Sequence, residues 1–209
     1  MAKPRIVFLT NNLPVTENLF KFLSQQAEII LYSDKPSLEK FKEFSPDWFI
    51  SYNYRFIIGE EILREFPNRF INLHISYLPW NRGAYPNLWS FIEETPKGVT
   101  IHLIDQGLDT GDILFQKEVF IEEEKHTLAS SYNLLHKEIQ TLFIQNWERI
   151  KTENLCPKPQ QGKGTFHTVK EFKKYLKPII DKHGWNIPIP LFKKLARERL
   201  KQMKGETKC

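Results

Sequence analysis

The sequence has few of the features that mark membrane-spanning, secreted or metal-binding proteins. It contains only two cysteines, Cys156 and Cys209, and they match neither a metal-binding spacing nor a disulfide framework. No apolar run approaches the roughly 18–20 residues of a membrane-spanning helix. The apolar run after the basic N-terminus is about five residues long, shorter than the ~7–15-residue core of a signal peptide. We therefore expect a cytoplasmic protein that has no resident metal and does not bind membranes.

Aromatic and apolar residues, by contrast, are plentiful enough to build a packed core. The chain has 209 residues, of which 41% are hydrophobic, and these include 16 Phe and 5 Trp. Its net charge of +5 is uneven, because residues 170–209 hold 12 Lys and Arg against 4 Asp and Glu. A basic tail of this kind meets an anionic ligand or partner, or forms a solvated amphipathic helix. We favour the solvated helix.

Strand-like and helix-like segments alternate along the chain through about residue 150. The expected strands are Arg5–Thr10, Ala27–Tyr32, Trp48–Tyr52, Phe70–Ile75, Val99–Ile104 and Ile113–Ile121. The expected helices are Pro14–Gln25, Ser37–Phe44, Glu60–Phe66, Leu88–Glu93 and Thr127–Lys151. Strands that alternate with helices are typical of an α/β fold. The pattern predicts a doubly wound, mostly parallel, Rossmann-like sheet.

The composition changes after residue 151, where a Pro- and Gly-rich connector occupies residues 154–168. Two helical stretches follow it, near residues 168–180 and 190–204. We therefore predict a main domain over residues 1–151. Residues 152–209 are predicted to form the connector and a basic, helical C-terminal extension.

Polar side chains stand where the predicted strands end, which is where open α/β sheets bind their ligands. Asn72 and His74 are two positions apart on one strand, so they share a face of the sheet. The acidic loop Asp105–Asp112 follows the next strand, and we expect it at the same edge. An amide and an imidazole can donate to a developing oxyanion, and a carboxylate can orient the imidazole. The pattern indicates carbonyl chemistry.

Three motifs stand in order along the chain. They read Asn72-x-His74-x-Ser76-x-Leu78-Pro79, Arg82-Gly83-Ala84 and Asp105-x-Gly107-x-Asp109-Thr110-Gly111-Asp112. Together they resemble the folate-dependent formyltransferase family over roughly residues 1–150. The resemblance implies a formyltransferase fold, N10-formyltetrahydrofolate as the formyl donor, and an amine as the acceptor.

The resemblance also implies a role for each of the residues in these motifs. Asn72 and His74 are expected to stabilise the oxyanion, while Asp109 holds His74 and helps to deprotonate the amine. The folate is expected to lie between the loop after the third strand and the acidic loop. The predicted folate-binding residues are Arg55, Phe56, Ile57, Asp105, Gly107 and Leu108.

The acceptor is less directly indicated by the sequence. Residues 10–14 lack the glycine-rich phosphate loop of glycinamide ribonucleotide enzymes. The residues after 151 are too few and too helical for the β-barrel of methionyl-tRNA formyltransferases. The short chain is most similar to sugar N-formyltransferases, among them the enzyme of the pseudaminic acid pathway, which implies a nucleotide-linked amino-dideoxy sugar. The predicted sugar-nucleotide contacts are Tyr77, Trp80, Arg82 and Tyr85.

Three alternative functions are also compatible with the sequence. The chain is alternatively a methionyl-tRNA formyltransferase-like enzyme without the usual barrel, a non-catalytic folate-binding protein of the same fold, or a hydrolase that releases formate. We do not expect a nucleic-acid partner, and a homodimer is left open.

Overall fold

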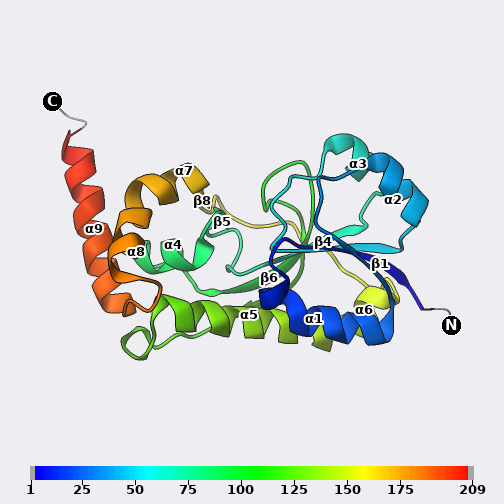
Figure 1. The fold of residues 1–209 in the computed structure, drawn as a ribbon, viewed down its shortest axis with the longest axis horizontal. Coiled ribbons are helices and arrows are strands. Elements are labelled where there is room, and N and C mark those ends of the chain that lie inside the picture. Colours follow the sequence, from blue (N-terminus) through cyan, green and yellow to red (C-terminus); the bar gives the residue numbers. More distant parts are fainter. Residues whose placement is uncertain (1–2, 207–209) are drawn as a thin grey trace.

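The computed structural model describes residues 3–206, with side chains through residue 203. Its centre is a six-stranded sheet in the order β2-β1-β3-β4-β6-β7 (Figure 1). The strands are β1 (Arg5–Leu9), β2 (Glu28–Tyr32), β3 (Trp48–Tyr52), β4 (Phe70–His74), β6 (Gly98–Leu103) and β7 (Ile113–Glu118). Each lies within a strand predicted from the sequence or extends one residue beyond it. The predicted mostly parallel α/β fold with a helical C-terminal segment is confirmed.

Helices cover both faces of the sheet, as a doubly wound fold requires. Those on one face are α1 (Leu13–Gln26), α5 (Leu128–Gln145) and α6 (Trp147–Lys151), and those on the other are α2 (Leu38–Phe44) and α3 (Glu60–Glu65) (Figure 1). In β1, Ile6 and Phe8 belong to the core on the α1 side, and Val7 and Leu9 to the core on the α2 side. Side chains alternate along a strand, so this continuously apolar segment is buried on both faces.

One strand of the sheet, β6, departs from the parallel pattern. β2, β1, β3 and β4 are mutually parallel, whereas β6 runs antiparallel to β4, and β7 antiparallel to β6. Leu103 at the end of β6 pairs with Ile71 near the start of β4. The acidic loop Asp105–Asp112 therefore does not leave the sheet at the edge where β4 ends, and this part of the sequence-based expectation was wrong.

The long helix predicted over Thr127–Lys151 is interrupted. Thr127 caps α5 by accepting a hydrogen bond from the backbone N–H of Ser130. The helix ends at Gln145, because Asn146 leaves helical geometry (φ −107°, ψ 7°) and its side chain bonds the carbonyl of Leu142. A short α6 then continues the chain. The apolar periodicity is nearly continuous across this break, so the pattern did not reveal it.

The chain after residue 151 packs against the sheet domain. A two-stranded parallel sheet joins β5 (Arg82–Gly83) to β8 (Phe166–His167), a pairing that the sequence did not predict. The remaining elements are α4 (Pro86–Ile92), the 3₁₀ turn η1 (Glu123–Lys125), α7 (Val169–Glu171), the π-helical segment η2 (Phe172–Leu176), α8 (Lys177–His183) and α9 (Ile189–Glu206).

Helix α9 is fixed to α4 and η1 by burial and by charge. Phe192 and Ala196 are fully buried. Lys193 pairs with Glu94 and Glu123, so part of the basic charge of the tail is neutralised within the chain. Among the described residues, no helix has the length and apolarity needed to cross a bilayer.

Candidate active site

Strand β4 presents two polar side chains on one face. Ile71 and Leu73 enter the core on the α1 side. Asn72 and His74 alternate with them and therefore point to the opposite face. His74 is buried and Asn72 is partly buried. The apolar partners fix the register of the strand, so its pleat places the amide and the imidazole side by side.

Asp109 contacts both of the other predicted catalytic residues, Asn72 and His74. Its Oδ1 accepts a hydrogen bond from Nδ2 of Asn72 at 3.1 Å, and its Oδ2 accepts one from the backbone N–H of Gly83 at 2.8 Å. The Nδ1 atom of His74 lies 3.6 Å from the same Oδ2. The structure thus brings the three predicted catalytic residues together, although the acidic loop leaves from the far end of β6. It does so because the loop folds back across the face of β4.

Gly83 meets two requirements at this point. Its φ of +85° is left-handed, and a Cβ atom there would lie 2.3 Å from the carbonyl oxygen of His167. Only glycine combines that backbone conformation with so close an approach of β8. Its N–H is thereby aimed at the carboxylate of Asp109.

A second histidine, His102, belongs to the same cluster and was missed from the sequence. It pairs with Asn72 across β4 and β6, and its Nε2 lies 3.2 Å from Nδ2 of Asn72 and 3.5 Å from Oδ1 of Asp109. Its Nδ1 is 2.7 Å from the carbonyl oxygen of Leu103 and donates to it. Nε2 accepts from Asn72 when the ring is neutral and donates to Asp109 when the ring is protonated. A signal was available, because His102 is a polar residue near the end of the predicted strand Val99–Ile104, the kind of position at which Asn72 and His74 were singled out.

The electrostatics of the cluster favour an ionised Asp109. Burial alone would raise the pKa of its carboxyl. The attraction of His74, the hydrogen bond and attraction of His102, and the N–H of Gly83 outweigh burial and hold the pKa well below its ordinary value. The site therefore contains a fixed negative charge against which histidine protons can be held or moved.

His74 is held on its other side by the loop after β4. Its Nε2 lies 3.1 Å from the carbonyl oxygen of Asn81, which is completely buried. The Asn81 side chain accepts from Thr95 at 2.7 Å and donates to Glu93 at 3.1 Å. Its backbone N–H donates to the hydroxyl of Thr165 at 2.9 Å. Both ring nitrogens of His74 therefore face acceptors, the Asn81 carbonyl and the Asp109 carboxylate.

A narrow cavity of about 130 Å³ opens on the Asn72 face. It is lined by Ser51, Tyr54, Arg55, Phe56, Ile57, Ile58, Asn72, His102, Ile104, Asp105, Gly107, Leu108 and Asp109. All six predicted folate-binding residues are in this set. Ile57 and Leu108 are 76% and 46% exposed. Two uncovered apolar side chains beside a polar cluster suit a flat aromatic ligand that carries polar edges.

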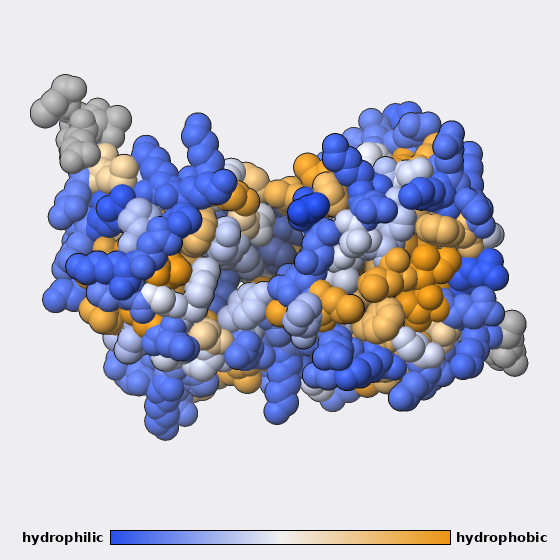
Figure 2. Space-filling view, viewed as in Figure 1, coloured by the Kyte–Doolittle hydropathy of each residue, from blue (hydrophilic) through white to orange (hydrophobic). Residues whose placement is uncertain are grey.

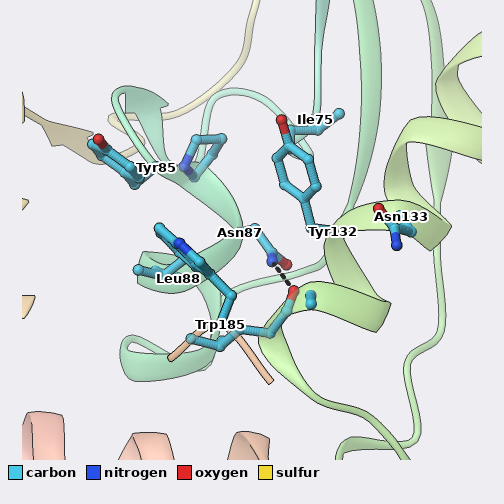
Figure 3. Close-up of a pocket in the computed structure, with 10 residues that line it drawn as sticks. Ile75, Tyr85, Asn87, Leu88, Tyr132, Asn133 and Trp185 are labelled. Atoms are coloured by element: carbon cyan, nitrogen blue, oxygen red, sulfur yellow. Dashed lines mark hydrogen bonds between the residues drawn. The ribbon is translucent and has the colours of Figure 1, made fainter. Parts of the chain in front are cut away.

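A larger, mostly apolar cavity of about 340 Å³ lies where the chain leaves β4 (Figure 3). It is lined by Ile75, Tyr85, Pro86, Asn87, Leu88, Leu128, Ala129, Tyr132, Asn133 and Trp185. Figure 3 shows Tyr85 and Trp185 on one side of it and Tyr132 on the other. The amide of Asn87 is committed to the carbonyl of Leu128 and the hydroxyl of Ser131.

The four predicted sugar-nucleotide contacts are not gathered in this cavity. Tyr85 lines it and stacks on Phe172 at 3.6 Å between ring centroids. Tyr77 and Trp80 are partly buried and line neither this cavity nor the narrower one. The guanidinium of Arg82 is bound to Gln160.

The space-filling view shows the face hollowed near its middle, between the end that carries α8 and α9 and the end that carries α2 and α3 (Figure 2).

The molecule is thus an α/β protein with an Asn-His-Asp cluster beside two cavities, an arrangement that suits carbonyl chemistry, and comparison with known proteins gives the family. Residues 18–146, more than half of the chain, match the formyl transferase family. The chain belongs to this family, and the resemblance seen in its motifs is confirmed.

Curated relatives of the chain include methionyl-tRNA formyltransferases. The chain is 38% identical to the methionyl-tRNA formyltransferase of Thermodesulfovibrio yellowstonii over 136 residues, which are 64% of this chain and 43% of that protein. The corresponding enzyme of Clostridium botulinum is 35% identical over 74% of this chain and 50% of that protein. The chain thus spans about half the length of the curated relatives it matches.

Solved structures match over more of the chain. The formyltransferase PseJ from Anoxybacillus kamchatkensis, solved in complex with UDP-4,6-dideoxy-4-formamido-L-AltNAc and tetrahydrofolate, is 41% identical. The match has a TM-score of 0.80 and covers 92% of this chain and 98% of that one. A sugar N-formyltransferase from Shewanella shares the fold at 22% identity, with a TM-score of 0.69 over 82% of this chain and 79% of that one.

Proposed function

We propose that this chain transfers a formyl group from N10-formyltetrahydrofolate to the amine of a nucleotide-linked amino-dideoxy sugar. The observation that carries the proposal is the Asn72–His74–Asp109 cluster, which has a cavity on each side of the end of β4. The nearly full-length match to a sugar formyltransferase supports the acceptor class. A UDP-linked 4-amino-4,6-dideoxy sugar is the particular acceptor we favour.

The narrow cavity is the proposed donor site. Phe56, Ile57 and Leu108 offer apolar walls, and Asn72 and Asp109 stand at its inner end. The carboxylate of Asp105 is held within its own loop, because it accepts from the N–H of Gly107 at 3.1 Å and from the hydroxyl of Thr110 at 2.7 Å. We therefore assign Asp105 the task of shaping the loop around the folate. The folate supplies the activated formyl group.

The side chains of the cluster suit the transfer of a formyl group to an amine. The amine nitrogen forms a bond to the formyl carbon while the bond from that carbon to N10 breaks. The amine loses one proton, and N10 gains one. His74 lies against the Asp109 carboxylate, so the pair can take up the amine proton, directly or through a water molecule.

Stabilisation of the oxyanion requires a rearrangement of Asn72. Its Nδ2 contacts Asp109 and His102 in this structure. An amide nitrogen has two protons, so donation to the formyl oxygen exchanges one of these two contacts. The contact with His102 is the one we expect to be exchanged, because the contact with Asp109 is charge-assisted and therefore stronger.

The larger cavity is the proposed acceptor site. Ile75, which directly follows His74, lines it, whereas no residue of the cluster does, so an acceptor bound there has to extend past the end of β4 to bring its amine to the cluster. Neither Lys nor Arg is among its lining residues in the described part of the chain. The aromatic walls therefore suit an uncharged, planar part of the acceptor, such as a nucleobase, and leave the diphosphate near solvent.

The competing acceptor is initiator tRNA, which the identity to methionyl-tRNA formyltransferases favours. Those matches cover about half of the relatives' length, whereas the match to the sugar enzyme is nearly complete on both sides. The pairing of Lys193 and Arg197 with Glu94 also removes basic charge that a nucleic acid would need. We rank tRNA second.

A formyl-transfer assay tests the proposal. The purified protein is incubated with N10-formyltetrahydrofolate and either UDP- or dTDP-linked amino-dideoxy sugars or aminoacylated initiator tRNA, and product mass is followed. We expect one formyl group to appear on a UDP-linked sugar. Transfer to tRNA alone would establish the alternative, and formate release without an acceptor would indicate a hydrolase.

The same assay separates an enzyme from a non-catalytic binding protein. Asp109→Asn keeps the size of the side chain but removes the charge that faces both histidines, so we expect kcat to fall by roughly 10²–10⁴-fold. Asp181→Asn, an exposed aspartate that pairs with Lys177, is the matched control. Equal turnover in Asp109→Asn and wild type would remove Asp109 from the mechanism.

A further inference from the structure

Gln160, in the connector that follows α6, is bonded to the catalytic loop on one side and to the β5 loop on the other. Its Nε2 donates to the backbone carbonyls of Asp109 at 2.8 Å and Gly111 at 2.9 Å. Its Oε1 accepts from Nε and Nη2 of Arg82 at 3.1 and 2.7 Å. Both N–H protons and both oxygen lone pairs of the amide are therefore used, and its orientation is fixed.

The hydrogen bonds of Gln160 hold the loop that carries Asp109. Asp109 has a left-handed backbone (φ +54°), a conformation that is uncommon for residues other than glycine and that the hydrogen bonds around it stabilise. Arg82 is followed by Gly83, whose N–H holds the Asp109 carboxylate. Gln160 thus binds the backbone of Asp109 directly. It is linked to the side chain of Asp109 indirectly, through Arg82 and Gly83.

The connector itself is anchored against the loop before β5, so it can serve as a fixed support. The N–H of Thr165 donates to the carbonyl of Pro79 at 3.2 Å, and the N–H of Arg82 donates to the carbonyl of Thr165 at 3.0 Å. A Cβ atom on Gly164, whose φ is +64°, would lie 2.0 Å from the Pro79 carbonyl oxygen. The two segments are therefore in direct backbone contact.

We propose that Gln160 is a positioning residue for the transfer reaction, one that holds Asp109 in register with His74, and that Arg82 orients Gln160. The inference rests on the proposed function for its kinetic readout. It assigns Arg82 a role within the protein, in place of the sugar-nucleotide contact expected from the sequence. Catalysis depends on sub-ångström placement of such groups, and a displacement of about 1 Å costs up to roughly 100-fold in rate.

Two variants separate positioning from general stability. Gln160→Ala removes all four hydrogen bonds. Gln160→Glu keeps the acceptor for Arg82 but sets a carboxylate against the carbonyls of Asp109 and Gly111. We expect both to lower kcat by roughly 10- to 100-fold while the KM values for donor and acceptor change less than about threefold. Because Gln160→Glu retains the Arg82 contact, we expect its Tm to stay close to that of the wild type.

Gln161→Ala is the matched control, because Gln161 is the adjacent glutamine, is exposed, and has no hydrogen bond in the described part of the chain. A measurement independent of activity is the NMR resonance of the Gly83 amide, which is hydrogen-bonded to Asp109. We expect it to move upfield and to exchange faster with solvent in both Gln160 variants, and to stay unchanged in Gln161→Ala.

The outcomes are distinct. A kcat within twofold of wild type in both Gln160 variants, or a loss of activity that merely follows Tm, would overturn the positioning role. An unchanged Gly83 amide in both variants would overturn it as well. A wild-type protein that formylates nothing would refute the proposed function instead, and the Gly83 amide would still decide whether Gln160 holds Asp109.

Discussion

Helix α5 carries a buried histidine that lies outside the catalytic cluster. His136, on α5, is 4% exposed, and its Nδ1 lies 2.5 Å from the hydroxyl of Tyr52. Gln140 donates to that hydroxyl from 3.4 Å, so the hydroxyl proton points to Nδ1 and the neutral ring carries its own proton on Nε2. Nε2 is buried without a partner among the described residues. Burial therefore lowers the pKa of His136 from 6.5 to about 4.

A lowered histidine pKa makes the folded state less stable in acid. Above the unfolded pKa of about 6.5 the ring is neutral in both states and contributes nothing. As the pH falls below this value, His136 becomes protonated in the unfolded chain but stays neutral in the folded chain, so stability decreases. The loss continues until the pH reaches the folded pKa near 4. The full difference is roughly 3 kcal/mol, and about 2 kcal/mol of it is lost by about pH 5.

The prediction is tested by urea unfolding of the wild type and of His136→Asn at about pH 7.5 and about pH 5. Asparagine keeps an acceptor near the Nδ1 position but does not titrate. The smaller side chain lowers stability at both pH values by about 1–3 kcal/mol. We expect the variant to lose about 2 kcal/mol less than the wild type between the two pH values. Equal losses in the two proteins would refute the assignment of a buried neutral ring.

Two further substitutions probe how the site is built. Gly83→Ala places a Cβ atom 2.3 Å from the carbonyl oxygen of His167, so we expect kcat to fall and stability to drop by about 1–3 kcal/mol. Gly59→Ala, where a Cβ meets nothing within 4 Å, is its control, and equal Tm and kcat in the two variants would refute the reasoning. Trp185→Ala removes one wall of the acceptor cavity, so we expect the sugar KM to rise roughly tenfold or more with kcat little changed. The control is Phe120→Ala, an 87% exposed ring that lines neither cavity, and a normal sugar KM in Trp185→Ala would move the acceptor elsewhere.

The sequence predicted the strands and most helices well, because the core strands are rich in apolar residues and the long helices α1 and α5 are amphipathic. It did not predict that β6 runs opposite to the other strands. Hydrophobic pattern reports which residues are buried, and Val99 and Ile101 are buried equally well in either direction. The β5–β8 pairing was also invisible, since strands of two residues have no periodicity.

The candidate site was predicted in part, and the reasons differ from residue to residue. Asn72, His74 and Asp109 were found through motifs, because a resemblance to a family carries information that periodicity lacks. Gln160 lies in a Pro- and Gly-rich connector where no pattern singles out one glutamine. Arg82 was predicted to contact the sugar nucleotide, but only the fold reveals that its guanidinium is bound to Gln160.

The division of the chain at residue 151 remains a prediction, but it does not divide the site. Gln160 reaches the catalytic loop from beyond that boundary, and Trp185 and Phe172 build the wall on which Tyr85 stacks. Residues predicted as a connector and a basic extension therefore supply one support for Asp109 and one side of the acceptor cavity. If the proposed function holds, substitution of Trp185 changes the binding of the acceptor, whereas the lining of the folate cavity comes entirely from residues before 110.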